Sequence, residues 1–567
     1  MLLDIDEASW NEFMPKGVTK KLFKDFIKYY DPEIFVGAGH KIRNLARSAD
    51  ELKPTERVKK IAELFSTFKN PDKETVLTPF RVVNIHMSDC LGGYDFFDER
   101  HEKILDVPRF VDCGQVTTET FSNTQAKILE INSKTGLYPL YVTYSIYRAR
   151  LGNRDEKDLT LEESQKIWDE TISTNIFVIC KTPMAKAITK RTLTGFREVA
   201  VNAHYFDDLI NYLKNKPEKF IERILKKNYW KKGGGKMKFD AVVGNPPYQV
   251  MDNGAQASAK PIYNHFVDAG KKLGAQYMSF IIPSRWYAGG KGLDLFRDDM
   301  LEDKHLEKLF DCLTPEYIFP NTNIRSGVCW FLRNTEFDNK KDLMRVVTVE
   351  KNLVTDDVRR PLKVEGTNIF IRHSQAISIL NKVQKNSSEF MDSWISPRKP
   401  FGIESSFSKS DDFKETKDEN HDVECLGKGL KIGYINRSQI VSHQEWIDEW
   451  KIFMPRANNI GTELNDDNLN AFVGKPNEIC TESYLVIGGE RDLNESQCNN
   501  ICGYFKTRFA RFMHGVAKAS HDATAKTFCF VPVQDFSKSW TDEELYLKYG
   551  LSDEEIKFIE STIKPMG

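Results

Sequence analysis

Asn245, Pro246, Pro247 and Tyr248 form the turn whose residue types are best suited to chemistry in this chain. The turn directly follows the apolar run 239–243, a pattern that predicts a buried strand ending in a polar, aromatic corner. Consecutive prolines restrict φ and donate no N–H, so the turn holds its carbonyl oxygens and the Asn245 amide oxygen as hydrogen-bond acceptors. The Asn245 side chain and the Pro246 carbonyl could bind both hydrogens of an exocyclic purine amine and direct its lone pair toward an electrophile.

Tyr248 offers a flat aromatic face at the same corner. A base whose amine is paired inside a duplex must first leave the stack, and an aromatic ring could hold it outside. In the alternative interpretation the turn only ends a strand, and Tyr248 is a packing residue. The motif therefore predicts a catalytic pocket for a planar amine, with all four residues of the turn as its catalytic residues.

Apolar runs on both sides of this turn predict the sheet that must position it. Helical or polar stretches separate five runs suited to buried strands, at 127–131, 175–180, 239–243, 277–282 and 327–332. Alternation of strands and helices is typical of a parallel α/β sheet. We expect one catalytic α/β domain over residues 75–335.

Two further regions flank this domain. Apolar residues at three- and four-residue steps over 18–68 predict helices, so residues 1–74 are expected to form a helical N-terminal extension. Over 336–567, Ser552 with Glu555 predicts the capping box of a final helix. Earlier in this region, short strand-like runs occur at 431–434, 451–454 and 484–487. We expect residues 336–567 to form a separate, mixed α+β C-terminal domain.

The composition limits the class of protein. In 567 residues, 81 Lys and Arg nearly balance 82 Asp and Glu, so DNA binding would need local clusters of basic residues. The ten cysteines include no Cys-x-x-Cys pair, which disfavours a metal site and is typical of reduced thiols in a cytoplasm. No apolar run approaches the roughly 20 residues of a membrane span. We expect a soluble cytoplasmic protein that needs no metal.

The Asn-Pro-Pro-Tyr turn after an apolar strand resembles that of the adenine-specific DNA methyltransferases of type II restriction-modification systems, the Eco57I-like methylase family. The resemblance runs from residue 75 to the end of the chain. It implies a Rossmann-like domain that binds S-adenosyl-L-methionine and methylates the N6 amine of adenine in duplex DNA by base flipping. Double-stranded DNA is the expected partner, together with a separate restriction endonuclease or another defence-system subunit.

The resemblance also implies a set of cofactor-binding residues. The Thr-Pro pair would contact the methionine end of the cofactor, Glu130 its ammonium group, and Asp207 its adenine amine. The full set is Thr78, Pro79, Glu130, Gly136, Asp207 and Asn245. Thr-Pro is also a common helix start, and Asp207 with Asp208 could instead cap a helix.

Two positions depart from the pattern of the family. Lys134 stands where the first glycine of the cofactor loop is usual. The acidic residue that binds the ribose hydroxyls is absent, since Cys180 or Lys181 occupies its place. Two alternative functions stay open: a DNA-binding specificity subunit with weak or no cofactor binding, and a methyltransferase acting on a protein glutamine.

The segment 504–512 carries the candidate DNA contact. Its three phenylalanines would share the apolar face of one helix, and the opposite face would carry the basic residues Lys506, Arg508 and Arg511. The alternative is a solvated basic face without a ligand. Because no metal-dependent nuclease motif precedes the Thr-Pro pair, we expect a methylase without its own cutting domain.

Overall fold

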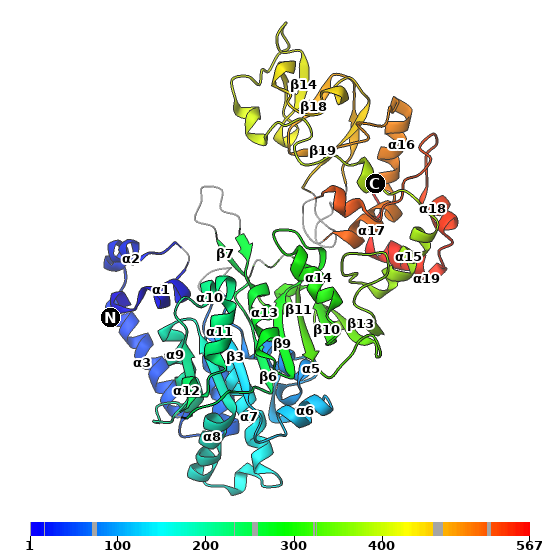
Figure 1. Cartoon of the computed structure of the whole chain (residues 1–567). Coiled ribbons are helices and arrows are strands. Elements are labelled where there is room, and N and C mark those ends of the chain that lie inside the picture. The colour runs from blue at the N-terminus through cyan, green and yellow to red at the C-terminus, as the bar shows by residue number, and fades with distance from the viewer. Residues whose placement is uncertain are drawn as a thin grey trace. The chain divides into compact units, whose positions relative to one another are not determined.

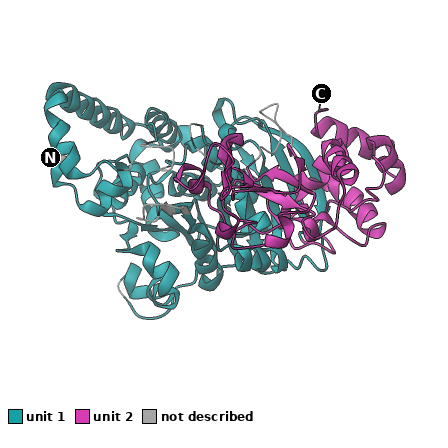
Figure 2. Ribbon diagram, turned by 90° about the horizontal axis from the view of Figure 1, so that it is seen from above, with its two compact units in different colours: residues 1–362 teal, residues 363–567 magenta. Residues whose placement is uncertain are grey.

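The computed structural model describes residues 2–15, 17–70, 76–231, 233–251, 259–320, 322, 324, 326–457, 469–518 and 523–566. The chain divides into two compact units, Met1–Leu362 and Lys363–Gly567 (Figure 2). The boundary therefore lies beyond residue 335, where the sequence pattern placed it. The polar stretch 335–343 resembles a linker, but it joins two strands of one sheet. The N-terminal helices belong to the same unit as this sheet.

A nine-stranded mixed sheet forms the centre of the first unit, in the order β13-β12-β10-β11-β9-β6-β3-β4-β5 (Figure 1). Neighbouring strands are parallel except in the pairs that include β11 or β13. The strands are β3 Ile128–Ser133, β4 Ile176–Cys180, β5 Asn202–Tyr205, β6 Ala241–Gly244, β9 Tyr277–Pro283, β10 Leu306–Cys312, β11 Val328–Asn334, β12 Met344–Glu350 and β13 Leu353–Arg360.

The five strands predicted from apolar runs are present as β3, β4, β6, β9 and β11. Of these, β3, β4, β6 and β9 are buried along their whole length, as expected for strands covered by helices on both faces. Strands β5, β10, β12 and β13 were missed, because they are short or interrupted by charged residues. The parallel sheet that we expected is thus one side of a larger mixed sheet, from β9 to the edge strand β5, and the predicted strand β11 is antiparallel to both of its neighbours.

Helices cover this sheet in two groups. Helix α7 packs against α5, α8 and α9, whereas α13 packs against α10 and α11. The bounds are α5 Phe80–Cys90, α6 Gln115–Thr120, α7 Leu137–Leu151, α8 Leu161–Asn175, α9 Pro183–Thr194, α10 Leu209–Asn215, α11 Pro217–Ile224, α12 Lys227–Trp230, α13 Tyr263–Leu273 and α14 Asp294–Glu302.

The strand order reverses between β3 and β6, which lie side by side in the middle of the sheet (Figure 1). From β3 the chain proceeds outward to β4 and β5, and then returns to β6 on the other side of β3. Open α/β sheets bind ligands beyond the carboxyl ends of their strands at such a switch point. At this point Gly244 packs so closely on β3 that a Cβ atom would lie 2.8 Å from the Ile131 carbonyl oxygen.

The N-terminal part of the first unit is helical, as predicted over 18–68, and begins with a helix that was not predicted. The helices are α1 Glu7–Phe13, α2 Lys20–Phe26, α3 Pro32–Ala49 and α4 Pro54–Ser66. Helix α1 packs against α9, which directly follows β4. Buried Arg57 in α4 donates to the Thr192 carbonyl at 3.0 Å, so these helices are joined to the sheet domain.

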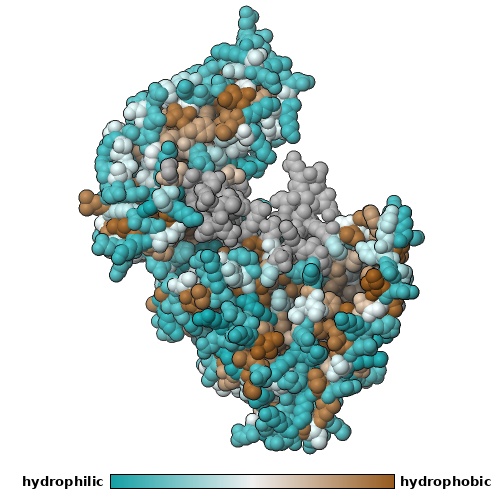
Figure 3. Space-filling model, turned by 180° about the vertical axis from the view of Figure 1, so that it is seen from behind, coloured by the Kyte–Doolittle hydropathy of each residue, from teal (hydrophilic) through white to brown (hydrophobic). Residues whose placement is uncertain are grey.

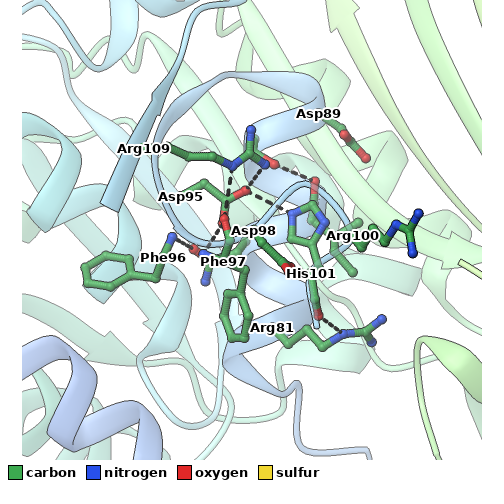
Figure 4. Close-up of polar contacts among 12 residues, drawn as sticks. Arg81, Asp89, Asp95, Phe96, Phe97, Asp98, Arg100, His101 and Arg109 are labelled. Atoms are coloured by element: carbon green, nitrogen blue, oxygen red, sulfur yellow. Dashed lines mark hydrogen bonds and ion pairs between the residues drawn. The ribbon is translucent and has the colours of Figure 1, made fainter. Parts of the chain in front are cut away.

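A charged cluster closes the hairpin that follows α5 (Figure 4). The hairpin consists of β1 Gly93–Phe97 and β2 Ile104–Val111. The carboxylate of fully buried Asp95 lies 2.6 Å from Arg109 Nη2 and 2.9 Å from His101 Nε2. Arg81 in α5 donates to the His101 carbonyl at 2.6 Å. The cluster therefore ties the hairpin to the helix that begins after Pro79.

The second unit combines small sheets with helices. Its strands pair in the orders β15-β14-β18 and β17-β16-β19. The strands are β14 Val423–Leu426, β15 Ile432–Ile435, β16 Lys451–Pro455, β17 Phe472–Gly474, β18 Glu478–Cys480 and β19 Tyr484–Ile487, and the helices are α15 Ser374–Lys385, α16 Glu495–Lys506, α17 Arg508–Ala517, α18 Asp542–Tyr549 and α19 Asp553–Thr562. The three predicted strand-like runs are present as β15, β16 and β19. The predicted capping box also forms, since Ser552 Oγ accepts from the Glu555 amide at 3.3 Å.

In the described part of the chain, no helix is both long and apolar enough to cross a bilayer. On the face shown in Figure 3, apolar residues lie in separate groups among hydrophilic ones.

Candidate functional site

A cavity of about 130 Å³ lies at the carboxyl ends of β3, β4 and β6, where the strand order reverses. Strand β3 and the loop after it, the residue after β4, the turn after β6, the segment before α5 and helix α1 all contribute to its wall. The lining residues are Asn11, Glu12, Val76, Thr78, Glu130, Asn132, Lys134, Thr135, Tyr138, Lys181, Asn245, Pro246, Pro247, Tyr248 and Gln249. All four residues of the Asn-Pro-Pro-Tyr turn thus line one cavity, and their catalytic role stays a prediction.

Asn245 is held by contacts on both its side chain and its backbone. Its Nδ2 donates to Thr78 Oγ1 at 2.9 Å, and its carbonyl accepts from Asn132 Nδ2 at 3.3 Å. The remaining amide oxygen, Oδ1, is buried and has no hydrogen-bond partner among the described residues. The contact with Thr78 therefore orients the amide and leaves its oxygen as an available acceptor at the cavity.

Tyr248 closes the turn with its ring partly buried. The ring packs edge-on against Phe319, with centroids 6.3 Å apart and planes at 80°. Its carbonyl accepts from the Ile262 amide at 3.2 Å, which ties the turn to the start of α13. Burial raises the pKa of the Tyr248 hydroxyl well above its usual value. The ring is thus a neutral aromatic surface at the cavity.

Glu130 is the acidic residue of the cavity wall on β3. Only 5% of the residue is exposed, and its Oε2 has no partner within the described structure. Burial raises the pKa of this carboxyl group to about 8, because the charged form loses its hydration. Glu130 is therefore mostly protonated at neutral pH, and a cation entering the cavity would favour its ionisation.

The structure shows where the two departures from the family pattern lie, at Lys134 and at the end of β4. Lys134 lines the cavity, and its Nζ donates to the Val76 carbonyl at 3.1 Å. At the end of β4, Lys181 lines the cavity, whereas Cys180 does not. The buried Cys180 thiol lies 3.8 Å from Thr189 Oγ1 in α9, and burial raises its pKa.

Three of the predicted cofactor residues do not line the cavity. Pro79 is exposed and caps α5. Gly136 has φ of +77°, and a Cβ atom there would lie 3.0 Å from Thr189 Cα, so this glycine permits the packing of α7 on α9. Asp207 follows β5 and is exposed, away from the cavity wall. Gly136 thus makes close contact with α9, and its contact with the cofactor stays a prediction.

Asp208, the alternative to Asp207, begins α10 in a left-handed conformation with φ of +53°. Its side chain makes no N-cap hydrogen bond, and its Oδ2 accepts instead from Asn211 Nδ2 at 2.8 Å. The predicted cap made by an aspartate pair is therefore not formed.

Sequence reasoning missed the cavity residues Asn11, Glu12, Asn132 and Tyr138. Asn132 follows Glu130 by two positions and adopts φ of +76°, a conformation that Asn tolerates better than most residues. Its position two residues after Glu130, on the same strand, was the signal that could have identified Asn132 as a residue of the cavity. Glu12 carries no such signal, because it reaches the cavity from a helix far away in the sequence.

The predicted basic face over 504–512 does not form. The segment is broken at Thr507, which ends α16 and caps α17. Arg511 is only 4% exposed and donates to the Lys564 carbonyl at 2.8 Å, while Arg508 pairs with Glu560 at 3.0 Å. Lys506 is exposed on α16. Phosphate contact thus stays a prediction for Lys506, and Arg511 has a structural role.

A doubly wound α/β sheet with a polar cavity at its switch point defines a domain suited to a nucleotide-like ligand. Residues 174–319, which include β4, β6 and the Asn-Pro-Pro-Tyr turn, match the family described as Eco57I restriction-modification methylase. A curated protein of Mycoplasma pneumoniae, described as an uncharacterized adenine-specific methylase, is 31% identical over 140 residues, which are 22% of this chain and 33% of that protein. The chain thus matches about a third of the length of this relative. These matches confirm the predicted resemblance to adenine-specific methylases of restriction-modification systems.

Solved structures of restriction-modification enzymes are also similar to this chain. A nuclease-deletion mutant of the Type ISP enzyme LlaGI, in complex with a DNA substrate mimic, has 10% identity and a TM-score of 0.46, covering 83% of this chain and 47% of the other. The Type IIL enzyme MmeI in complex with DNA has 9% identity and a TM-score of 0.42, covering 78% and 71%.

Proposed function

We propose that this chain is a site-specific DNA methyltransferase that transfers a methyl group from S-adenosylmethionine to the N6 amine of adenine in duplex DNA. One observation carries the proposal. Around a single cavity lie four buried acceptor atoms that lack a partner in the described structure: Glu12 Oε1, Glu130 Oε2, Asn132 Oδ1 and Asn245 Oδ1. Because a buried acceptor without a donor is costly, a cavity that collects several is suited to a ligand rich in donors.

The residues of the cavity fit S-adenosylmethionine. Glu130 can accept from the ammonium group of the methionine end, and this positive charge would favour the ionised carboxylate. Lys134, which already reaches the cavity wall, can balance the carboxylate of the same end. When bound, the cofactor supplies a methyl group on a sulfonium, which is an electrophile.

The Asn-Pro-Pro-Tyr turn would act on the adenine. The Asn245 Oδ1 atom can accept one hydrogen of the N6 amine, and the Pro246 carbonyl in the same turn can accept the other. Both bonds draw the amine away from conjugation with the ring and direct its lone pair at the methyl group. These two acceptors would stabilise the positive charge that the nitrogen gains on methylation, until one of its protons passes to water.

Adenine must leave the duplex to reach this turn, because its amine is otherwise paired. The neutral ring of Tyr248 at the cavity supplies a surface on which an extruded base can stack. Duplex DNA is therefore the proposed substrate. A separate endonuclease or another defence-system subunit is the proposed partner, in the cytoplasm.

Labelled S-adenosylmethionine, offered to the purified chain with duplex DNA, tests the proposal. We expect N6-methyladenine in the digested DNA. Asn245→Ala should lower the rate about 100-fold or more, in line with removal of a single group that stabilises developing charge, and should leave DNA binding unchanged. Asn215→Ala, an exposed asparagine outside the cavity, is the matched control.

Full activity of Asn245→Ala would contradict the role of the turn. Label that enters protein glutamine and not DNA, when both are supplied, would instead favour a protein methyltransferase.

A further inference from the structure

Glu12 is a buried carboxylate that reaches the cavity from the N-terminal helix α1. The residue is 3% exposed, and its Oε2 accepts a hydrogen bond from Thr182 Oγ1, in the residue that caps α9. Its second oxygen, Oε1, is buried and has no partner among the described residues. Capping of α9 accounts for one oxygen of this carboxylate, and the other is available to a ligand.

Helix α1 holds this carboxylate firmly. One turn before Glu12, the fully buried Ser9 accepts from the Met184 amide in the first turn of α9 at 3.1 Å. Trp10 is 1% exposed, and its indole N–H donates to the Val18 carbonyl at 2.7 Å. The position of Glu12 relative to the end of β4 is thus determined by the buried contacts of Ser9 and Trp10 in the same helix.

The end of β4 lacks an acceptor side chain of its own. Cys180 is directed toward Thr189, and Lys181 is a donor. The two hydroxyl groups of a ribose are donors that need a strong acceptor when they are buried, and hydrogen bonds to a carboxylate are among the strongest in proteins. Glu12, which is hydrogen-bonded to Thr182 directly after Lys181, places such an acceptor at this edge of the cavity.

We propose that Glu12 binds the ribose hydroxyl groups of the cofactor, so that a residue of the N-terminal helix completes the cofactor site of the α/β domain. This inference rests on the proposed function, since it requires that the cavity binds S-adenosylmethionine. Glu12 acts here as a binding residue and takes no part in methyl transfer.

Calorimetric titration with two ligands tests this assignment. The ligands are S-adenosylhomocysteine and its analogue in which the ribose lacks both hydroxyl groups. Wild type should bind the first more tightly than the second. Glu12→Gln should weaken the binding of S-adenosylhomocysteine about 10- to 100-fold, as expected for loss of a hydrogen bond to a charged group. It should leave the affinity for the analogue within about twofold, because the analogue has no hydroxyl group to lose.

Glu7→Gln is the matched control, since Glu7 is on the same helix, is exposed and lies 3.6 Å from Lys20. It should change neither affinity. If Glu12→Gln does not fold, Glu12→Asp replaces it as the test. Asp retains the charge but withdraws it from the cavity, so this variant should weaken the binding of S-adenosylhomocysteine and not that of the analogue without hydroxyl groups.

The inference would be overturned if the Glu12 variant bound both ligands more weakly to the same extent, or bound both as tightly as wild type. Either result would leave the proposed function intact. Wild type that does not distinguish the two ligands would likewise overturn the inference and leave the proposed function intact. Wild type that binds neither ligand would overturn the proposed function, and the inference would fall with it.

Discussion

Glu130→Gln should stabilise the ligand-free protein at neutral pH, although it removes a residue of the proposed active site. Burial raises the pKa of Glu130 from its ordinary 4.5 to about 8. Below pH 4.5, the native and unfolded states both hold the proton. Between these two pKa values the unfolded state has released its proton and the native state has kept it, so rising pH favours unfolding by about 1.4 kcal/mol per pH unit.

This slope gives a destabilisation of about 3 kcal/mol at pH 7 that glutamine, which does not titrate, would remove. The measurement is urea unfolding of wild type and Glu130→Gln at pH 5 and pH 7. Amide hydrogen exchange in β3 would report on the first unit separately. From pH 5 to pH 7, the unfolding free energy of the variant minus that of wild type should increase by about 2 to 3 kcal/mol. Exposed Glu198→Gln is the matched control and should show no such shift.

A difference that stays constant between pH 5 and pH 7 would refute the reasoning, because Glu130 would then ionise in the native protein as it does in the unfolded chain. A second measurement probes the ligand. Binding of S-adenosylhomocysteine to wild type at pH 7 should release about one proton as the ammonium group ionises Glu130, and calorimetry in buffers of different ionisation enthalpy measures this release.

Two further predictions concern residues around the site. Tyr248→Ala should weaken binding of an extruded adenine by about 1 to 3 kcal/mol, as measured with DNA that carries an unpaired adenine, and Tyr248→Phe should retain the affinity because stacking needs only the ring. Unchanged affinity of the Ala variant would argue against stacking. Arg109→Ala should lower the free energy of unfolding by about 2 kcal/mol, because it removes the guanidinium that pairs with buried Asp95 and leaves this carboxylate with His101 and the Phe97 amide. The effect should be smaller than for a fully buried pair, since the Arg109 side chain is 33% exposed. A change under about 0.5 kcal/mol in urea unfolding would show that the pair is no stronger than a surface one.

Local sequence was informative wherever one segment carries both the structure and the chemistry. The run 239–243 predicted β6, and the prolines after it predicted a stiff turn of acceptors, because both depend on neighbouring residues alone. Glu130 was named from the family resemblance of the segment around it, and its place on the apolar strand β3 is what the local sequence predicted. The Thr-Pro pair correctly marked the start of α5, but its contact with Asn245 joins residues that are distant in the sequence.

Predictions failed where a side chain is placed by contacts between distant segments. The basic face over 504–512 followed from helical periodicity, yet a cap at Thr507 breaks the helix, and packing buries Arg511. For Gly136, the sequence did not indicate that α9 packs against it, and its contact with the cofactor stays a prediction. The end of the sheet domain was misplaced because a polar turn and a polar linker have the same composition.

The sequence by itself determined that this chain contains a strand ending in an Asn-Pro-Pro-Tyr turn, because periodicity and proline geometry act over a few residues. Only the tertiary structure decided that Glu12, Glu130, Asn132 and Asn245 meet around one cavity. Their approach depends on the order of strands in the sheet and on the packing of α1 against α9. Both are set by burial of apolar surface across long sequence separations, which no local pattern records.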